Sequence, residues 1–209
     1  MEISGHNKIK VSRKSPRRRT GPVVFSIMKS ESYHLPFFLD HYRDLGVSNF
    51  LICNDLSSDG TTELLLSQDD VTVITSDIPY GAVIEGERWV SVLKRTVPNS
   101  LIKKGWAIIA DADEYLFLPS DFENIIELVG YMEGQDNICA SASLVDFYPE
   151  RLAKRLYPRN LSPQSQCRYF DKGKLFDWTP GESKPQPRFS GVHARLHRLL
   201  KQNHEEEYN

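Results

Sequence analysis

The sequence predicts a three-layer α/β/α fold with a mainly parallel sheet. Between residue 23 and about residue 147, short apolar runs of strand length alternate with segments whose apolar residues recur at helical spacing. Polar and turn-forming residues separate these segments. Strands that alternate with helices form βαβ units, in which helices cover both faces of a parallel sheet. The chain has 209 residues, which is enough for one well-filled domain and too few for two typical ones.

Five apolar runs are predicted to be strands, and they cover residues 23–27, 49–53, 71–75, 106–110 and 138–147. The run at 106–110 is apolar throughout, a pattern that indicates a buried strand. Polar segments follow the runs at 23–27, 49–53 and 106–110 directly. In an open α/β sheet, ligands bind at the carboxyl ends of the strands, so these segments are the candidate binding loops.

Four segments have the spacing of helices. The apolar residues that mark the first are Leu35, Phe38, Leu39, Tyr42 and Leu45. Pro36 stands near its start and Gly46 just past its end, and a second helix is predicted to begin near Thr61. The residues that mark the third are Trp89, Leu93, Val97 and Leu101. Pro98 predicts a kink or an early stop in this third helix, and a capping box at 120–123 predicts the start of the fourth.

The N-terminal segment 1–20 is strongly basic, with seven lysine and arginine residues against a single acid, Glu2. This composition predicts a disordered, solvated tail, and contact with anionic lipid or another polyanion is the functional alternative. Residues 21–200 are expected to form one domain, and residues 201–209 a polar tail. From about residue 148 onward the regular periodicity fades, which is typical of a functional lid or binding surface.

The bulk composition excludes several classes of protein. A net charge of −2 and 40% hydrophobic residues are ordinary for a globular protein and do not indicate nucleic acid as the main partner. No segment has the roughly 18 apolar residues that a transmembrane helix needs, and the N-terminus lacks the apolar core of a signal peptide. The three cysteines have no metal-type spacing. We therefore expect a cytoplasmic protein, with a peripheral position on the inner face of the membrane as the alternative that the basic N-terminus offers.

The most informative feature is the pair Asp111 and Asp113 at the end of the predicted strand 106–110. Two carboxylates one residue apart can hold a hard divalent cation and leave coordination positions open for phosphate oxygens. An Asp-x-Asp pair alone is a weak signal, because surface turns are rich in aspartate. Its position directly after an apolar strand makes it a candidate site for a metal-bound nucleoside diphosphate.

Three segments resemble motifs of family 2-like glycosyltransferases. Residues 24–31 and 35–47, which include the sequence His-Tyr-Arg-Asp-Leu-Gly-Val, are similar to the start of the subgroup with a Lys-Asn-Glu turn and a His-Tyr-x-x-Leu-Gly-Val helix. Residues 54–61, Asn-Asp-Leu-Ser-Ser-Asp-Gly-Thr, resemble the Asp-Asp-Gly-Ser-x-Asp-Gly-Thr signature. Residues 111–116, Asp-Ala-Asp-Glu-Tyr-Leu, resemble the metal-binding motif. The motifs occur in the order of the family.

The resemblance implies a GT-A fold and a glycosyltransferase of the hexosyltransferase type. Such an enzyme uses a nucleoside-diphosphate sugar as donor, Mn²⁺ or Mg²⁺ as cofactor, and a hydroxyl of a glycan or lipid-linked saccharide as acceptor. It also implies that residues 21–118 form the nucleotide-sugar half and residues 119–200 the acceptor side.

The predicted site residues fall into two groups. Those expected to bind the nucleotide sugar are Glu31, Asn54, Asp55, Asp59, Lys94, Arg95 and Asp111. Asp111 and Asp113 are expected to bind the metal. Asp59 is as well explained by a turn or a helix cap, and Lys94 and Arg95 by solvated helix charges. The base that deprotonates the acceptor is sought after the metal motif, where Asp146 and Asp171 are the candidates.

Two other functions stay open. One is a truncated or inactive protein that binds a nucleotide sugar without transferring it. The other is a nucleotidyltransferase, which also combines an α/β sheet with metal-binding carboxylates. Against the latter, the segment after the first predicted strand contains no glycine-rich phosphate loop with lysine or arginine.

Overall fold

The computed structural model describes residues 2–3, 6–16, 21–102, 104–137, 139–140, 142, 144–150, 158, 160–170, 176–177 and 186–187. The chain divides into two compact units, Met1–Ile138 and Cys139–Asn209. The first unit contains the large sheet and all the predicted nucleotide-sugar and metal residues. The boundary expected between the two functional halves, at residues 118 and 119, falls inside this unit.

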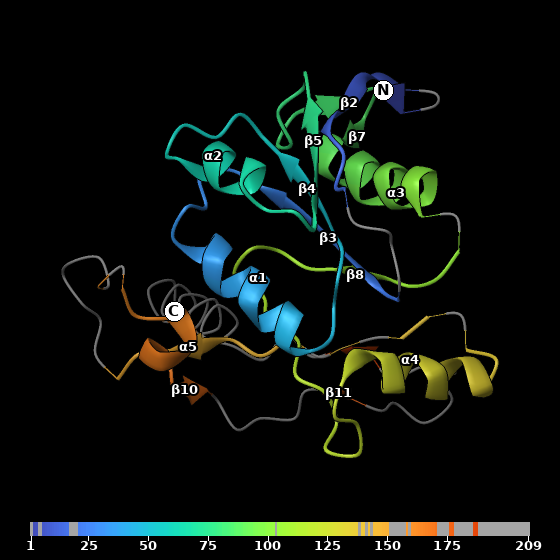
Figure 1. Ribbon diagram of the computed structural model, residues 1–209, viewed down its shortest axis with the longest axis vertical. Coiled ribbons are helices and arrows are strands. Elements are labelled where there is room, and N and C mark those ends of the chain that lie inside the picture. Colours follow the sequence, from blue (N-terminus) through green and yellow to red (C-terminus); the bar gives the residue numbers. More distant parts are fainter. Residues whose placement is uncertain are drawn as a thin grey trace, which may run out of the picture. The chain divides into compact units, whose positions relative to one another are not determined.

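A six-stranded sheet forms the centre of the first unit, in the order β1-β2-β5-β4-β3-β8 (Figure 1). The strands are β1 (Glu2–Ile3), β2 (His6–Arg13), β3 (Val23–Met28), β4 (Phe50–Asn54), β5 (Val71–Ser76) and β8 (Ala107–Ile109). Strands β5, β4, β3 and β8 are mutually parallel, whereas β2 is antiparallel to β5 and β1 to β2. The prediction of a mainly parallel sheet is confirmed.

The order of the parallel strands defines where a ligand would bind. In chain order they are β3, β4, β5 and β8, but in the sheet β5 and β4 lie on one side of β3 and β8 lies on the other. The direction of winding therefore reverses between β3 and β8. Such a topological switch point opens a crevice at the carboxyl ends of the two strands, and Rossmann-like folds bind their ligands there.

Helices cover both faces of the sheet (Figure 1). The four helices of the first unit are α1 (His34–Asp44), α2 (Thr61–Leu66), α3 (Trp89–Leu101) and α4 (Ile125–Gly134). Buried side chains of α1, α2 and α4 share one core with one face of β3, β4 and β5. Buried side chains of α3 share a second core with the opposite face. This double cover explains why β3 and β4 read as continuous apolar runs rather than as alternating ones.

Two helix boundaries differ from the prediction. Helix α3 does not stop early at Pro98 but continues to Leu101, and the carbonyl of Pro98 still accepts a hydrogen bond from the N–H of Ile102 at 2.8 Å. Helix α4 begins after the segment 120–123, because Asn124 is its N-cap and accepts hydrogen bonds from two backbone N–H groups of the first turn. Helix α4 therefore begins a few residues after the start that the capping box at 120–123 predicts.

The predicted strand at 106–110 is present as β8 but is not buried. Its residue Ile109 is 47% exposed, because β8 ends the order of the sheet and pairs with β3. The predicted strand at 138–147 is wrong over most of its length. Among its described residues, only Phe147 belongs to a strand, β9 (Phe147–Tyr148).

The expectation of a disordered tail over residues 1–20 is wrong for residues 6–13, which form strand β2. Ile9 is 0% exposed and packs in the core under α3. The Arg13 guanidinium donates hydrogen bonds to backbone carbonyls at the end of α2, including that of Leu65, where a cation is favoured. The alternation of Ile9 and Val11 with lysines is typical of a half-buried strand, but the high charge of the whole segment favoured the prediction of a disordered tail.

The second unit contains short elements. Strands β9 and β10 (Tyr169–Phe170) pair in antiparallel orientation, so that Phe147 contacts Phe170 and Tyr148 contacts Tyr169. The remaining elements are α5 (Pro163–Gln166), β11 (Phe176–Asp177) and β12 (Gln186–Pro187). Across the described parts of both units, no helix is long and apolar enough to cross a membrane.

Candidate functional site

The loops that follow β3 and β4 are joined by hydrogen bonds at the carboxyl edge of the sheet. Three backbone N–H groups of the first loop donate to side chains of the second, from Ser30 to Ser57 at 2.9 Å, from Glu31 to Thr61 at 2.8 Å and from Ser32 to Asp59 at 2.9 Å. The register of β3 with β4 pairs Met28 with Asn54, so the two loops start at the same level. The loops of the first two motifs therefore form one hydrogen-bonded surface at the carboxyl edge of the sheet, which we call the rim.

Asp59 holds these loops together. One carboxylate oxygen accepts the hydrogen bond from Ser32, and the other accepts hydrogen bonds from the backbone N–H and the hydroxyl of Thr61. Desolvation alone would raise the pKa of Asp59, but the hydrogen bonds from Thr61 and Ser32 outweigh it and hold the pKa well below its ordinary value. These contacts favour the turn-forming interpretation of Asp59 over a direct contact with the nucleotide.

We expect Asp59→Asn to lower the free energy of unfolding by about 1 kcal/mol at pH 7, because the side chain is exposed and water screens its interactions. The folded-state pKa is depressed, so this stabilisation is fully present above the unfolded-state pKa of about 4 and is lost as the pH falls below it. Urea unfolding at pH 7 and pH 3 should show a difference between wild type and variant that shrinks at the lower pH. A constant difference, or an equal effect of Asp121→Asn at an exposed loop position, would contradict this role.

Asp55 is completely buried at the end of β4. Its Oδ1 accepts a hydrogen bond from the backbone N–H of Tyr80 at 3.0 Å, and its Oδ2 lies 3.5 Å from the ammonium group of Lys29. Oδ2 accepts no hydrogen bond from the described residues. A buried carboxylate oxygen without a hydrogen-bond donor has capacity to accept one, which a ligand could fill if the loops around it rearrange.

Asn54, beside Asp55, has a structural environment. Its amide nitrogen donates to the hydroxyl of Thr62 at 2.9 Å, and its amide oxygen accepts from the backbone N–H of Ser57 at 3.4 Å. The side chain is buried and joins the end of β4 to the start of α2. Asn54 therefore shapes the loop rather than presenting a free group at the rim.

Glu31 and Asp113 follow the two strands that flank the switch point. Burial raises the pKa of the Tyr115 hydroxyl most, and the neighbouring charges of Asp113 and Glu31 raise it further. Both carboxylates thus act on the same phenol ring, although one follows β3 and the other follows β8. Glu31 also contacts the ring of His34, with 2.8 Å between Oε2 and Nδ1. Acidic side chains of the loops after β3 and β8 thus influence the same tyrosine.

Burial of Ala112 and hydrogen bonds within the turn fix the conformation of the segment that carries Asp111 and Asp113. Ala112 is 5% exposed, and its burial leaves Asp111 and Asp113 on the outer side of the turn. Glu114 closes the turn, because its Oε2 accepts the backbone N–H of Asp111 at 2.9 Å and its own N–H donates to the carbonyl of Asp111 at 3.0 Å. Glu114 therefore sets the conformation of the motif.

The His-Tyr pair of α1 supports the same turn. The ring nitrogen Nε2 of His41 lies 2.8 Å from the carbonyl oxygen of Leu116. The Tyr42 hydroxyl donates to the carbonyl of Glu114 at 3.2 Å. Both contacts connect the helix after β3 to the loop after β8. The His-Tyr pair of the first motif thus has a structural role, because it holds the loop that carries the third motif.

Lys94 and Arg95 are adjacent in α3 but lie in different environments. The ammonium group of Lys94 is 2.9 Å from Oδ1 of Asp111. The Arg95 guanidinium instead forms a two-point ion pair with the partly exposed Glu87, at 2.6 and 3.0 Å. Glu87 belongs to β7 (Glu87–Arg88), which pairs with β6 (Val83–Ile84) in a hairpin. The structure therefore brings Lys94 to the Asp-x-Asp turn and takes Arg95 away from it.

The residues at the turn fit a divalent cation whose coordination is completed by a ligand. Within the described ranges, no group of three or more histidine, cysteine or acidic side chains is arranged to hold a metal ion. Magnesium-type sites, however, are commonly built from one or two carboxylates with phosphate oxygens and water. The Asp111 side chain is 51% exposed and Asp113 is exposed as well, so both offer hard oxygen donors to solvent.

The two candidate bases follow the Asp-x-Asp turn in the chain. Asp146 belongs to the second unit and directly precedes β9. Asp171 lies outside the described residues. The base therefore stays as open as the sequence left it.

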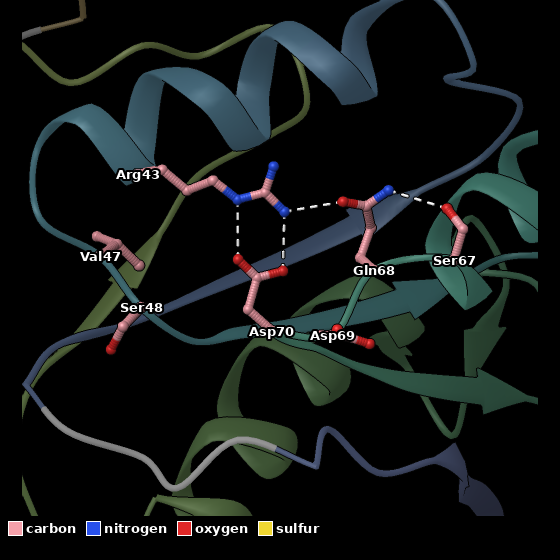
Figure 2. A pocket seen from close by; sticks show the side chains of 7 residues that line it. All are labelled: Arg43, Val47, Ser48, Ser67, Gln68, Asp69 and Asp70. Carbon is pink, nitrogen blue, oxygen red and sulfur yellow. Dashed lines mark hydrogen bonds and ion pairs between the residues drawn. The ribbon is translucent and has the colours of Figure 1, made fainter.

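A separate hollow lies at the opposite edge of the sheet, next to the amino ends of β4 and β5 (Figure 2). It is lined by Arg43, Val47, Ser48, Ser67, Gln68, Asp69 and Asp70. The Arg43 guanidinium donates two hydrogen bonds of 2.8 Å to Asp70, one to each carboxylate oxygen. One of the two donating nitrogens also donates to the side chain of Gln68 at 2.8 Å. Its principal charges neutralise each other, so we assign this hollow a structural role.

Comparisons of this chain with protein-family models, with curated proteins and with solved structures gave no match.

Proposed function

We propose that this protein is a metal-dependent glycosyltransferase of the GT-A type, which moves a sugar from a nucleoside-diphosphate sugar to a hydroxyl of a glycan or lipid-linked saccharide. One observation carries the proposal: three glycosyltransferase-like motifs, far apart in the sequence, occupy the carboxyl ends of the adjacent strands β4, β3 and β8. Strand ends beside a switch point are where open α/β sheets bind nucleotides.

Each motif has a chemical task in this proposal. Asp111 and Asp113 would hold Mn²⁺ or Mg²⁺ against the donor diphosphate, and the cation would stabilise the negative charge on the leaving nucleoside diphosphate. Asp55 would accept a hydrogen bond from the ribose or the base through its unused oxygen, Oδ2. Because Asp55 is 0% exposed and its Oδ2 lies 3.5 Å from the Lys29 ammonium group, that contact requires the surrounding loops and the Lys29 side chain to shift when the donor binds.

The acceptor side is assigned to the second unit. An inverting transfer needs a base for the acceptor hydroxyl, and Asp146 and Asp171 remain the candidates. Aromatic side chains of β9 and β10 are exposed in this unit, among them Phe147 and Tyr169. Aromatic faces pack well against the apolar faces of sugar rings, which supports an acceptor role for this unit.

The test is to incubate the full chain with a panel of nucleoside-diphosphate sugars, with and without Mn²⁺, and to measure donor hydrolysis and transfer to added glycans. Metal-dependent release of the nucleoside diphosphate is the expected result. Metal-dependent binding without turnover would instead indicate a protein that only binds nucleotide sugars. Formation of a nucleoside triphosphate from nucleotide sugar and pyrophosphate would identify a nucleotidyltransferase and contradict the proposal.

A further inference from the structure

The ammonium group of Lys94 lies beside the oxygen that the proposed metal would use. It is 2.9 Å from Oδ1 of Asp111, and the two side chains are 36% and 51% exposed. The carboxylate of Asp111 is thus already neutralised by a cation of the chain itself. A divalent cation that binds Oδ1 must displace the ammonium group, and a cation on the other oxygen of the same carboxylate is repelled by it.

The geometry of α3 allows such a displacement without a change of fold. The helix is anchored by buried side chains on the face toward the sheet, including Leu93 and Val97 at 0% exposure. Lys94 is next to Leu93 and leaves this anchored face, so its ammonium group is carried on a flexible four-carbon stem above a fixed backbone. The group can therefore change partner by rotation of the side chain alone.

We propose that Lys94 is a partner-exchanging cation, which holds Asp111 in the absence of ligand and moves to the donor diphosphate when the metal binds. This inference rests on the proposed function, since it assumes a metal-bound diphosphate at Asp111 and Asp113. Lys94 has two effects of opposite sign. It weakens the binding of the free metal by competing for Asp111, and it strengthens the binding of the nucleoside diphosphate by adding a charge-assisted contact.

The experiment measures these two effects separately with Lys94→Met, which keeps most of the side-chain length and removes the charge. Binding of Mn²⁺ alone, followed by electron paramagnetic resonance of the free ion, should tighten about three- to fivefold, the size expected for loss of a part-exposed ion pair. Binding of uridine and guanosine diphosphate in saturating Mn²⁺, measured by calorimetry, should weaken about tenfold or more for whichever nucleotide the wild type binds.

Arg95 offers a matched control on the same helix. Arg95→Met removes a neighbouring charge that is paired with Glu87 instead of Asp111, so both binding constants should stay at wild-type values. Lys94→Arg keeps the charge and should keep metal binding within about twofold of wild type. Thermal unfolding of each variant verifies that α3 is intact.

The outcomes separate this inference from the proposed function. If the wild type binds Mn²⁺ and a nucleoside diphosphate but Lys94→Met changes neither constant, or weakens metal binding, the exchange is refuted and the glycosyltransferase proposal stands. If the wild type shows no Mn²⁺-dependent binding of either nucleotide, both proposals are overturned. Opposite shifts of the two constants support the exchange, because a purely structural role for Lys94 would weaken both.

Discussion

Replacement of Asp113 by alanine should abolish metal-dependent binding of the nucleotide sugar and leave the fold intact. Asp113 is exposed on the turn after β8, and exposed substitutions of this kind usually change stability by less than about 0.5 kcal/mol. In the proposed site it supplies one of two carboxylates to the cation, so its removal should weaken Mn²⁺-dependent donor binding more than about 100-fold. Calorimetric titration with the donor, with and without Mn²⁺, measures this loss.

The control for Asp113→Ala is Asp121→Ala, which removes another exposed acid a short distance along the chain. It changes the net charge equally and should leave donor binding unchanged. Urea unfolding should give similar midpoints for both variants and the wild type. If Asp113→Ala binds and turns over the donor like the wild type, the assignment of the Asp-x-Asp turn to the metal is wrong.

The second large effect concerns stability, at the opposite edge of the sheet. Asp70→Ala should lower the free energy of unfolding by about 2–3 kcal/mol. The Asp70 side chain is 5% exposed and receives two hydrogen bonds from Arg43. Hydrogen bonding of the Arg43 guanidinium to the Asp70 carboxylate is the largest of the influences that raise the pKa of Arg43. Arg43 itself is 33% exposed, so water partly compensates the loss and the value stays below that of a fully buried pair.

A double-mutant cycle tests the pair as a unit. The double variant with Asp70→Ala and Arg43→Met should lose less free energy of unfolding than the two single variants lose together, because it leaves no unpaired charge behind. Urea unfolding at pH 7 gives all four free energies. Donor binding by Asp70→Ala should stay near the wild-type value below the unfolding transition, since Asp70 precedes β5 and the candidate site lies at the carboxyl ends of the strands. Additive effects would show that the two side chains do not stabilise the fold together.

The parallel core of the first unit follows from local sequence patterns alone. Strands β3, β4 and β5 and helix α1 were predicted within one or two residues of their bounds. These elements are buried on both faces or along a clear apolar stripe, so local pattern and tertiary environment agree. The placement of the three motif loops at strand ends followed from the same elements, because a parallel sheet places every βα loop at one edge.

The role of each polar side chain and the presence of the outer strands of the sheet depend on tertiary contacts. Asp55 and Asp59 lie in one motif, yet the first has an unused buried oxygen and the second is fully engaged in holding two loops. Lys94 and Arg95 are neighbours whose directions differ by about 100° around the helix, so they meet partners from the turn after β8 and from β7 respectively. Strand β2 depends on hydrogen bonds to β5, about 60 residues away in the chain. Local sequence encodes burial and periodicity, whereas these roles depend on which distant group each side chain meets.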